Sequence, residues 1–132
     1  MSTRSNIIVK DNHNSIQLYR HSDGYPNSEH GVIANLAEVL PFAWDLPRME
    51  ADDFAAAIVA AWKRRGGNIY IDGTARDDTL HGDIEYYYVI TPDEKTGKWR
   101  VEVHDYCSGY GNDIPKKDKI IWTGYIGEKY PE

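Results

Sequence analysis

The sequence of 132 residues has a single cysteine, two phenylalanines and no long apolar run. Cys107 has no second cysteine with which to form an intramolecular disulfide, which agrees with a reducing compartment. No stretch approaches the roughly 18–20 continuous apolar residues of a membrane-spanning helix. Near the N-terminus only Ile7, Ile8 and Val9 are consecutively apolar, whereas a secretory signal carries about 7–15 such residues. The sequence therefore predicts a cytoplasmic protein with no membrane partner.

Positive charge is also scarce, because 15 Lys and Arg stand against 21 Asp and Glu and leave a net charge of −6. An acidic surface repels phosphate backbones, so we expect no direct nucleic-acid binding. The same sign suits a protein that meets a basic partner surface, although a charge of this size is also ordinary for a small soluble domain. The length suits one domain over residues 1–132, and the apolar fraction of 41% is sufficient for a core.

Aromatic residues of one kind are abundant, with ten tyrosines and four tryptophans beside the two phenylalanines. Tyrosine and tryptophan combine an apolar body with a polar tip and are favoured at interfaces. They are also ordinary components of half-buried strands. The excess therefore suggests a binding surface without locating it.

The first half of the chain predicts a hairpin followed by two helices. Alternation over Ser5–Lys10 and Ser15–His21, with turn residues between them, predicts the hairpin. Ser28 is the expected N-cap of a first helix, which carries apolar residues up to Leu40 and ends at Pro41. A longer helix is expected over Met49–Arg65, with a stripe of Phe54, Ile58 and Trp62 facing the core and Gly66-Gly67 as its stop.

The second half predicts only strands. They are expected over residues 68–72, 83–91, 98–106 and 120–126, with a turn at Pro92–Gly97 between the middle two. In the strand from Asp83, we expect Ile84, Tyr86, Tyr88 and Ile90 on one face, and Tyr87 with Val89 on the other. The element order β-β-α-α-β-β-β-β predicts an α+β fold, in which an antiparallel sheet of five or six strands carries two helices on one face.

The end of the second strand concentrates chemically versatile side chains. They are Tyr19, Arg20, His21, Asp23 and Tyr25, with His30 close behind. His21, Asp23 and His30 are of types that bind metals, and a His21–Asp23 pair is suited to acid–base work. No nucleophile motif accompanies them, and the structural alternative is a turn at Asp23-Gly24 with Tyr25 and Pro26 packed beneath it. We therefore predict a binding loop with no catalytic residue, metal or cofactor, and lean against an enzyme.

Two further tyrosine-rich regions are candidate contact surfaces. The segment over residues 105–113 lacks the Gly-Lys-Ser/Thr ending of a P-loop, and we expect it either to position Tyr106 and Tyr110 for contact with a partner or to be a simple long turn. If the helices cover the Tyr86 face of the sheet, Tyr87 and His104 line the opposite, open face together with Tyr125. The alternative is a normal solvated sheet face.

The chain resembles a set of small uncharacterised proteins from bacteriophages and prophages. The resemblance covers about the first two-thirds of the chain and rests on the opening Met1–Ile7, the segment Tyr19–Pro26, the helix from Ala51 and the segment Gly82–Tyr86. Its most specific part is His-x-Asp-Gly-Tyr-Pro at His21–Pro26. The resemblance implies a mobile-element origin and action in the host cytoplasm, as an accessory protein that binds and blocks a host system.

Three functional hypotheses follow. The first is a non-enzymatic phage-type binder of a host protein, such as an inhibitor of a CRISPR effector or another defence complex. The second is a small-molecule or nucleotide site, or a small enzyme, at Arg20, His21 and Asp23. The third is a structural or regulatory phage component that forms a homo-oligomer through an exposed sheet edge. The sequence does not specify the partner or the oligomeric state.

Overall fold

The computed structural model describes residues 3–44, 47–64, 68–72, 84–106 and 119–131 of the chain. Their order confirms the expected succession of two strands, two helices and four strands, with a short 3-10 helix, η1, between the helices. The elements are β1 Ser5–Lys10, β2 Ser15–Arg20, α1 Val32–Ala37, η1 Leu40–Phe42, α2 Ala51–Arg64, β3 Tyr70–Ile71, β4 Tyr86–Asp93, β5 Lys98–Asp105 and β6 Lys119–Tyr125.

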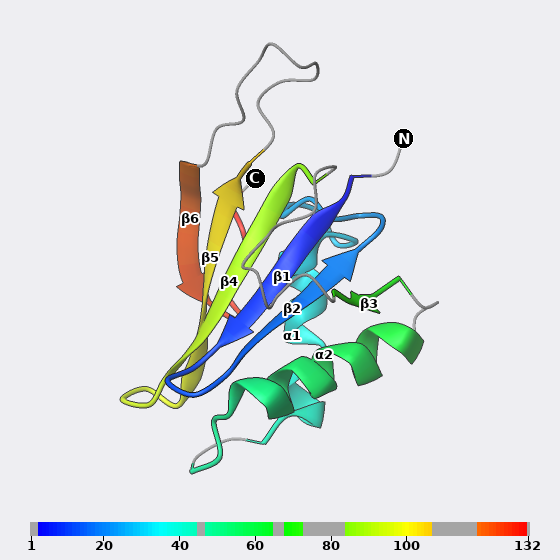
Figure 1. Cartoon of the computed structure of the whole chain (residues 1–132). Helices are drawn as coiled ribbons and strands as arrows, with labels where there is room; N and C mark the ends of the chain where they lie inside the picture. The colour runs from blue at the N-terminus through cyan, green and yellow to red at the C-terminus, as the bar shows by residue number, and fades with distance from the viewer. Residues whose placement is uncertain (1–2, 45–46, 65–67, 73–83, 107–118, 132) are drawn as a thin grey trace.

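The strands form one six-stranded sheet in the order β3-β2-β1-β4-β5-β6 (Figure 1). This confirms the α+β class and the expected number of strands. Four of the neighbouring pairs are antiparallel, but β1 and β4 run parallel, with Asn6 opposite Tyr87. Alternation in a sequence fixes which face a side chain takes but not the direction of a neighbouring strand, so the parallel pair was not predicted.

Both helices pack on the same face of the sheet, as expected, with α1 behind the sheet in Figure 1 and α2 below it. The predicted stripe of Phe54, Ile58 and Trp62 is buried, and the Phe54 ring stacks on Trp99 of β5 at a centroid distance of 4.4 Å. The sheet contributes alternate side chains to this core, namely Ile7, Val9, Leu18, Tyr88, Ile90, Trp99, Val101 and Val103.

Two details of β4 differ from the sequence prediction. Ile84 packs with Tyr19 and Tyr87 on the open face and not with Tyr86, because β4 begins at Tyr86 and the alternation does not extend before it. Pro92 was expected in the turn, but it lies within β4 and pairs with Trp99. The pairing of β4 with β1 ends at Ile90, so the missing N–H of Pro92 leaves no gap in that ladder.

The first helix is shorter than expected. The prediction of Ser28 as its N-cap is wrong: Gly31 holds that position and Ser28 has a φ of 70°. The helix ends at Ala37, and Pro41 lies inside η1 instead of terminating α1. The stop expected at Gly66-Gly67 lies outside the described residues. None of the described helices has both the length and the apolar character needed to span a bilayer.

The start of α2 is capped from the first hairpin. Asp11 Oδ2 accepts a hydrogen bond from the amide of Ala51 at 2.8 Å, while its Oδ1 accepts from the amides of His13 and Asn14, both at 2.7 Å. One carboxylate thus closes the β1–β2 turn and satisfies the first amide of α2. The Ala51 hydrogen bond is the main reason that the pKa of Asp11 lies below its usual value.

We therefore expect Asp11→Ala to lower the free energy of unfolding by about 1 kcal/mol at neutral pH. A lowered pKa stabilises the fold above the unfolded-state pKa of about 4, and that contribution is lost as the pH falls through the folded-state value. The stability of the parent chain should consequently fall more steeply below about pH 4 than that of the variant. Urea denaturation across this pH range tests this, with Glu94→Ala in the other hairpin turn as the control. Parallel pH profiles for parent and variant would contradict the capping role.

Candidate functional site

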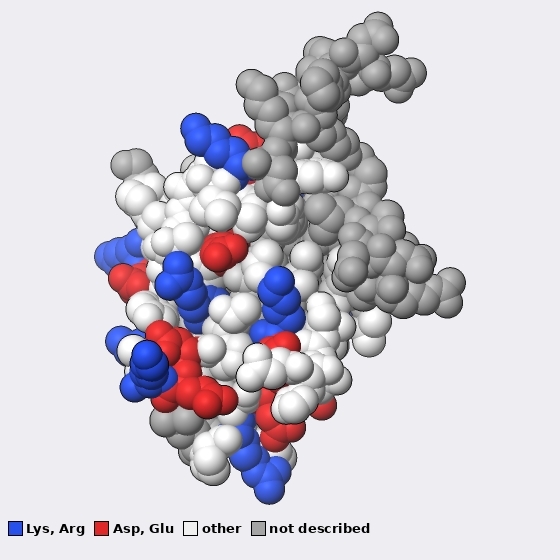
Figure 2. All heavy atoms as spheres, turned by 60° about the vertical axis from the view of Figure 1, so that its left-hand side comes forward, with Lys and Arg blue, Asp and Glu red and all other residues white. Residues whose placement is uncertain are grey.

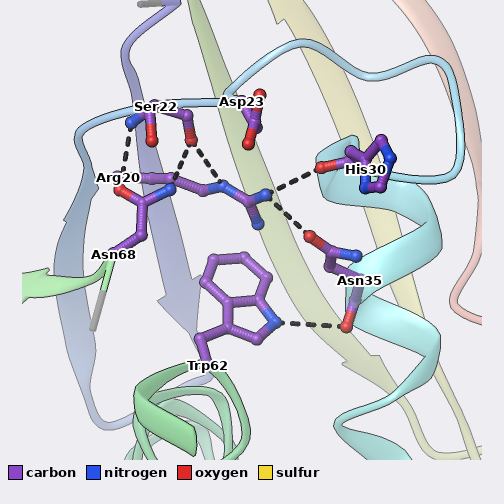
Figure 3. A pocket seen from close by; sticks show the side chains of 7 residues that line it. All are labelled: Arg20, Ser22, Asp23, His30, Asn35, Trp62 and Asn68. Carbon is purple, nitrogen blue, oxygen red and sulfur yellow. Dashed lines mark hydrogen bonds between the residues drawn. The ribbon is translucent and has the colours of Figure 1, made fainter. Parts of the chain in front are cut away.

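The strand-end loop that the sequence singled out is organised around Arg20, the last residue of β2. Its side chain is only 4% exposed and lies on the helix-covered side of the sheet. Nε donates to the carbonyl of Ser22 at 3.0 Å, and Nη2 donates to the carbonyl of His30 at 2.9 Å and to Asn35 Oδ1 at 2.7 Å (Figure 3). Arg20 therefore joins both ends of the loop to α1.

Two further side chains complete this arrangement. Trp62 of α2 lies under the guanidinium, whose carbon is 4.5 Å from the ring centroid, and its Nε1 donates to the Asn35 carbonyl at 3.1 Å. Asn68 accepts from the amides of His21 and Ser22 at 3.0 Å each and donates to the Ser22 carbonyl at 2.6 Å. The loop is thus held by β2, both helices and the segment before β3, a network that the sequence did not reveal.

A cavity of about 310 Å³ opens beside this network. It is lined by Arg20, Ser22, Asp23, His30, Asn35, Trp62 and Asn68 (Figure 3). Asp23 adopts a φ of 54°, an uncommon conformation for a residue other than glycine, and its carboxylate accepts from the Tyr25 hydroxyl at 3.0 Å. Residues other than glycine with a positive φ occur often at ligand sites, although turns contain them too.

The structure brings together some of the expected loop residues and separates others. Arg20, Asp23 and His30 line the cavity, and Tyr25 holds the Asp23 carboxylate from the side. His21 is exposed and does not line the cavity; its ring lies edge-on to Tyr19 at 6.5 Å. The strand ends at Arg20, so alternation does not continue to Asp23. No three His, Cys, Asp or Glu side chains converge as metal ligands among the residues that the structure describes.

The same loop also shows the packing that the structural alternative required. Pro26 is buried, and the carbonyl of Gly24 accepts a hydrogen bond from the buried Tyr88 hydroxyl at 2.6 Å. Burial is the main cause that raises the pKa of Tyr88 well above its ordinary value. A Cβ on Gly24 would approach Ser5 Oγ to 2.7 Å, so the loop lies against β1 at this point.

The open face of the sheet carries an aromatic row that contains Tyr87 and His104 of the expected patch but not Tyr125, whose hydroxyl donates to Asp93 Oδ2 at 2.6 Å. Tyr87 stacks on His104 at 4.2 Å and meets Tyr106 edge-on at 5.5 Å, while Tyr19 stacks on Tyr70 at 6.0 Å. Tyr19, Tyr87 and His104 are each less than 10% exposed, so this row offers a partner little area. Tyr110, the other candidate in this segment, lies outside the described residues.

A surface that the sequence did not single out lies on the connector between α1 and α2. Leu40, Phe42 and Trp44 are 41%, 44% and 52% exposed, and we call these three residues the aromatic surface. The sequence prediction included Leu40 among the apolar residues of the first helix, and Phe42 and Trp44 fall between the two predicted helices. The available signal was the presence of a phenylalanine and a tryptophan, both costly to expose, within a segment that has no strand or helix pattern.

Two arginines and a hydrogen-bonded backbone surround the aromatic surface. The guanidinium carbon of Arg48 lies 4.5 Å from the Trp44 ring centroid, and that of Arg64 lies 5.9 Å from the Phe42 centroid. The amide of Trp44 donates to Asp53 Oδ2 of α2 at 3.0 Å, and that of Phe42 donates to the Val39 carbonyl at 2.9 Å. The exposed rings are therefore carried on a backbone that is fixed to α2.

The two outer strands of the sheet give little support for edge-to-edge pairing. β3 has only two residues, and β6 is irregular where it meets His104. At the other end of β6, the amide of Tyr125 donates to Glu128 Oε1 at 2.6 Å and its carbonyl accepts from the Glu128 amide at 3.0 Å. Short strands, bulges and capped edges are features that discourage pairing with another chain.

Acidic and basic side chains are intermingled on the described part of the face drawn in Figure 2, where neither sign forms a continuous area. The net charge of −6 therefore does not correspond to a single acidic patch on this face.

Comparison of the chain with protein-family models, with curated proteins and with solved structures found no match in any of the three.

Proposed function

We propose that this protein is a non-enzymatic binder that docks on another protein through the aromatic surface. The observation that carries the proposal is the exposure of Leu40, Phe42 and Trp44 within five residues of chain. Exposing apolar rings to water is unfavourable, and contiguous patches of this kind mark interaction sites. Tryptophan and arginine, both found here, are the residues that most often dominate the binding energy of protein interfaces.

The fixed backbone supports the same proposal. The hydrogen bond from the Trp44 amide to Asp53 and the turn of η1 hold the backbone that carries the rings before any partner arrives. A partner therefore does not have to order this segment, which lowers the entropic cost of association. Together with the phage-like sequence motif, this is consistent with an accessory protein that blocks a host complex, such as a CRISPR effector or another defence assembly.

A capture experiment tests the proposal. The tagged full-length chain and a Phe42→Ser/Trp44→Ser variant are immobilised, exposed to bacterial lysate and washed, and the retained proteins are identified by mass spectrometry. We expect a stoichiometric protein that the parent retains and the variant loses by at least tenfold, as for hot-spot residues. Ile71→Ser is the matched control, since Ile71 is also exposed but lies on β3. If parent and variant retain the same proteins equally, the aromatic surface is not the docking site.

The cavity beside Arg20 favours a second candidate function, the binding of a small polar ligand. Its volume of about 310 Å³ suits a small metabolite, and Asp23 and His30 both reach its rim. Native mass spectrometry of the purified chain, with and without Asp23→Ala, tests this. We expect a retained metabolite that the substitution removes while the melting temperature changes by less than about 2 °C, as usual for an exposed side chain. A ligand-free parent chain, or a ligand retained equally by both, would count against the cavity.

A further inference from the structure

The arginines beside the aromatic surface are accessible from outside the chain. The guanidinium carbons of Arg48 and Arg64 lie within cation–π distance of the Trp44 and Phe42 rings, and both residues are exposed. A guanidinium carries a permanent positive charge and several N–H donors. The aromatic surface is therefore flanked by two exposed, cationic hydrogen-bond donors.

Among the residues that the structure describes, neither Arg48 nor Arg64 forms an ion pair. This is informative because carboxylates are in excess, at 21 against 15 basic residues. Asp53, an acidic residue of α2, accepts from the amide of Trp44. Within the described residues, no carboxylate pairs with these two guanidinium groups and competes with an external anion.

The exposed rings and the net charge of the chain indicate which class of anion binds the two arginines. A nucleic acid offers closely spaced phosphates, and a chain with a net charge of −6 is repelled by them. The same repulsion acts at an anionic lipid surface. The net charge by itself suits a basic partner surface, but the two local cations beside the rings favour a protein with a few carboxylates around an apolar pocket. A few carboxylates are also repelled less than a dense row of phosphates.

We propose that the partner presents an apolar pocket rimmed by Asp or Glu side chains, in which Phe42 and Trp44 insert while Arg48 and Arg64 bind the carboxylates. This inference rests on the proposed function and adds the chemistry of the partner. Planar guanidinium groups bind carboxylates in a bidentate manner, which specifies orientation as well as charge. The aromatic rings supply the apolar contact, and the arginines select an acidic rim over a neutral or basic one.

The test uses the immobilised full-length chain and nuclease-treated bacterial lysate. The protein under test is the one retained by the parent and lost by Phe42→Ser/Trp44→Ser. Its binding is then compared for the parent, for Arg48→Gln/Arg64→Gln and for Arg100→Gln, a control for an exposed arginine on the open face of the sheet. We expect the double glutamine variant to bind roughly tenfold more weakly at low salt, and the difference to shrink near 1 M salt, where the Debye length falls to about 3 Å.

A second arm identifies the carboxylates directly. In Arg48→Lys, the introduced amine can be joined to a contacting carboxylate by a zero-length carbodiimide cross-linker. We expect a cross-link from position 48 to an Asp or Glu of the captured protein that the parent chain does not form. Its absence, together with unchanged binding by the double glutamine variant, would overturn the acidic-rim inference and leave the proposed function standing.

Other outcomes separate the inference from the function on which it rests. If no retained protein depends on Phe42 and Trp44, both the docking function and its partner chemistry are wrong. If the chain instead captures nucleic acid from untreated lysate, or floats with vesicles that contain phosphatidylserine in a manner that requires Arg48 and Arg64, the anion is a phosphate. Either result would also overturn the inference.

Discussion

Replacing Arg20 with methionine is expected to lower the free energy of unfolding by about 2–4 kcal/mol, which corresponds to a melting temperature lower by roughly 10 °C. The buried Asn35 Oδ1 and the part-buried His30 carbonyl would both lose this donor, and a buried acceptor left without a partner costs about 1–3 kcal/mol. Ser22 would keep its bond from Asn68, and water entering the adjacent cavity would offset part of the loss. Methionine fills similar volume over Trp62, so the change isolates the polar contacts.

Urea denaturation followed by tryptophan fluorescence measures this effect. Arg64→Met is the matched control, because Arg64 also lies over an aromatic ring but is exposed, and we expect it to change the stability by less than about 0.5 kcal/mol. A loss below about 1 kcal/mol for Arg20→Met would mean that the network does not hold the fold together. Arg20 would then be better explained as a ligand-binding group at the cavity than as a structural link.

The two phenylalanines of the chain should respond to substitution in opposite ways. Phe54 is fully buried against Trp99 at the centre of the core, and Phe54→Ala is expected to cost about 3–5 kcal/mol through lost burial and the cavity it leaves. Phe42 is 44% exposed, and Phe42→Ala should change the stability by less than about 1 kcal/mol. Thermal and urea unfolding of both variants under the same conditions provide the comparison.

The same pair separates folding from function. Phe42→Ala should reduce capture of the partner while leaving the unfolding transition almost unchanged, because its ring contributes to binding and little to the core. A large loss of stability in Phe42→Ala would show that the aromatic surface is part of the fold, which would remove the main support for the docking proposal. A small effect of Phe54→Ala would contradict the placement of α2 against β5.

Local patterns were sufficient to predict most of the elements. The alternation in Ser15–His21 correctly separates Leu18 from Tyr19, and the four-residue spacing of Phe54, Ile58 and Trp62 correctly identifies the buried side of α2. Where the pattern was extended past the end of an element, it failed. Ile84 lies before the first residue of β4 and Leu40 lies after the end of α1, so neither keeps the face that its spacing predicts.

Local patterns also predicted only part of the candidate site. Its residue types indicated a site, and Arg20, Asp23 and His30 do line one cavity. Trp62 and Asn68, which organise this loop, lie more than 40 residues after Arg20 in the chain. The hydrogen bonds of Asn68 to His21 and Ser22, for example, span 47 and 46 residues. Contacts of this range depend on how the helices pack on the sheet, and no local motif encodes them.

By itself, the sequence determined the α+β class, the order of the elements and the faces of the regular strands and of α2, because these follow from side-chain periodicities of 2 and 3.6 residues. Only the tertiary structure decided that β1 and β4 run parallel, that Arg20 is buried against α1 and Trp62, and that Leu40, Phe42 and Trp44 remain exposed. Each of these depends on which distant surfaces meet, and burial is a property of the whole packed chain rather than of any segment.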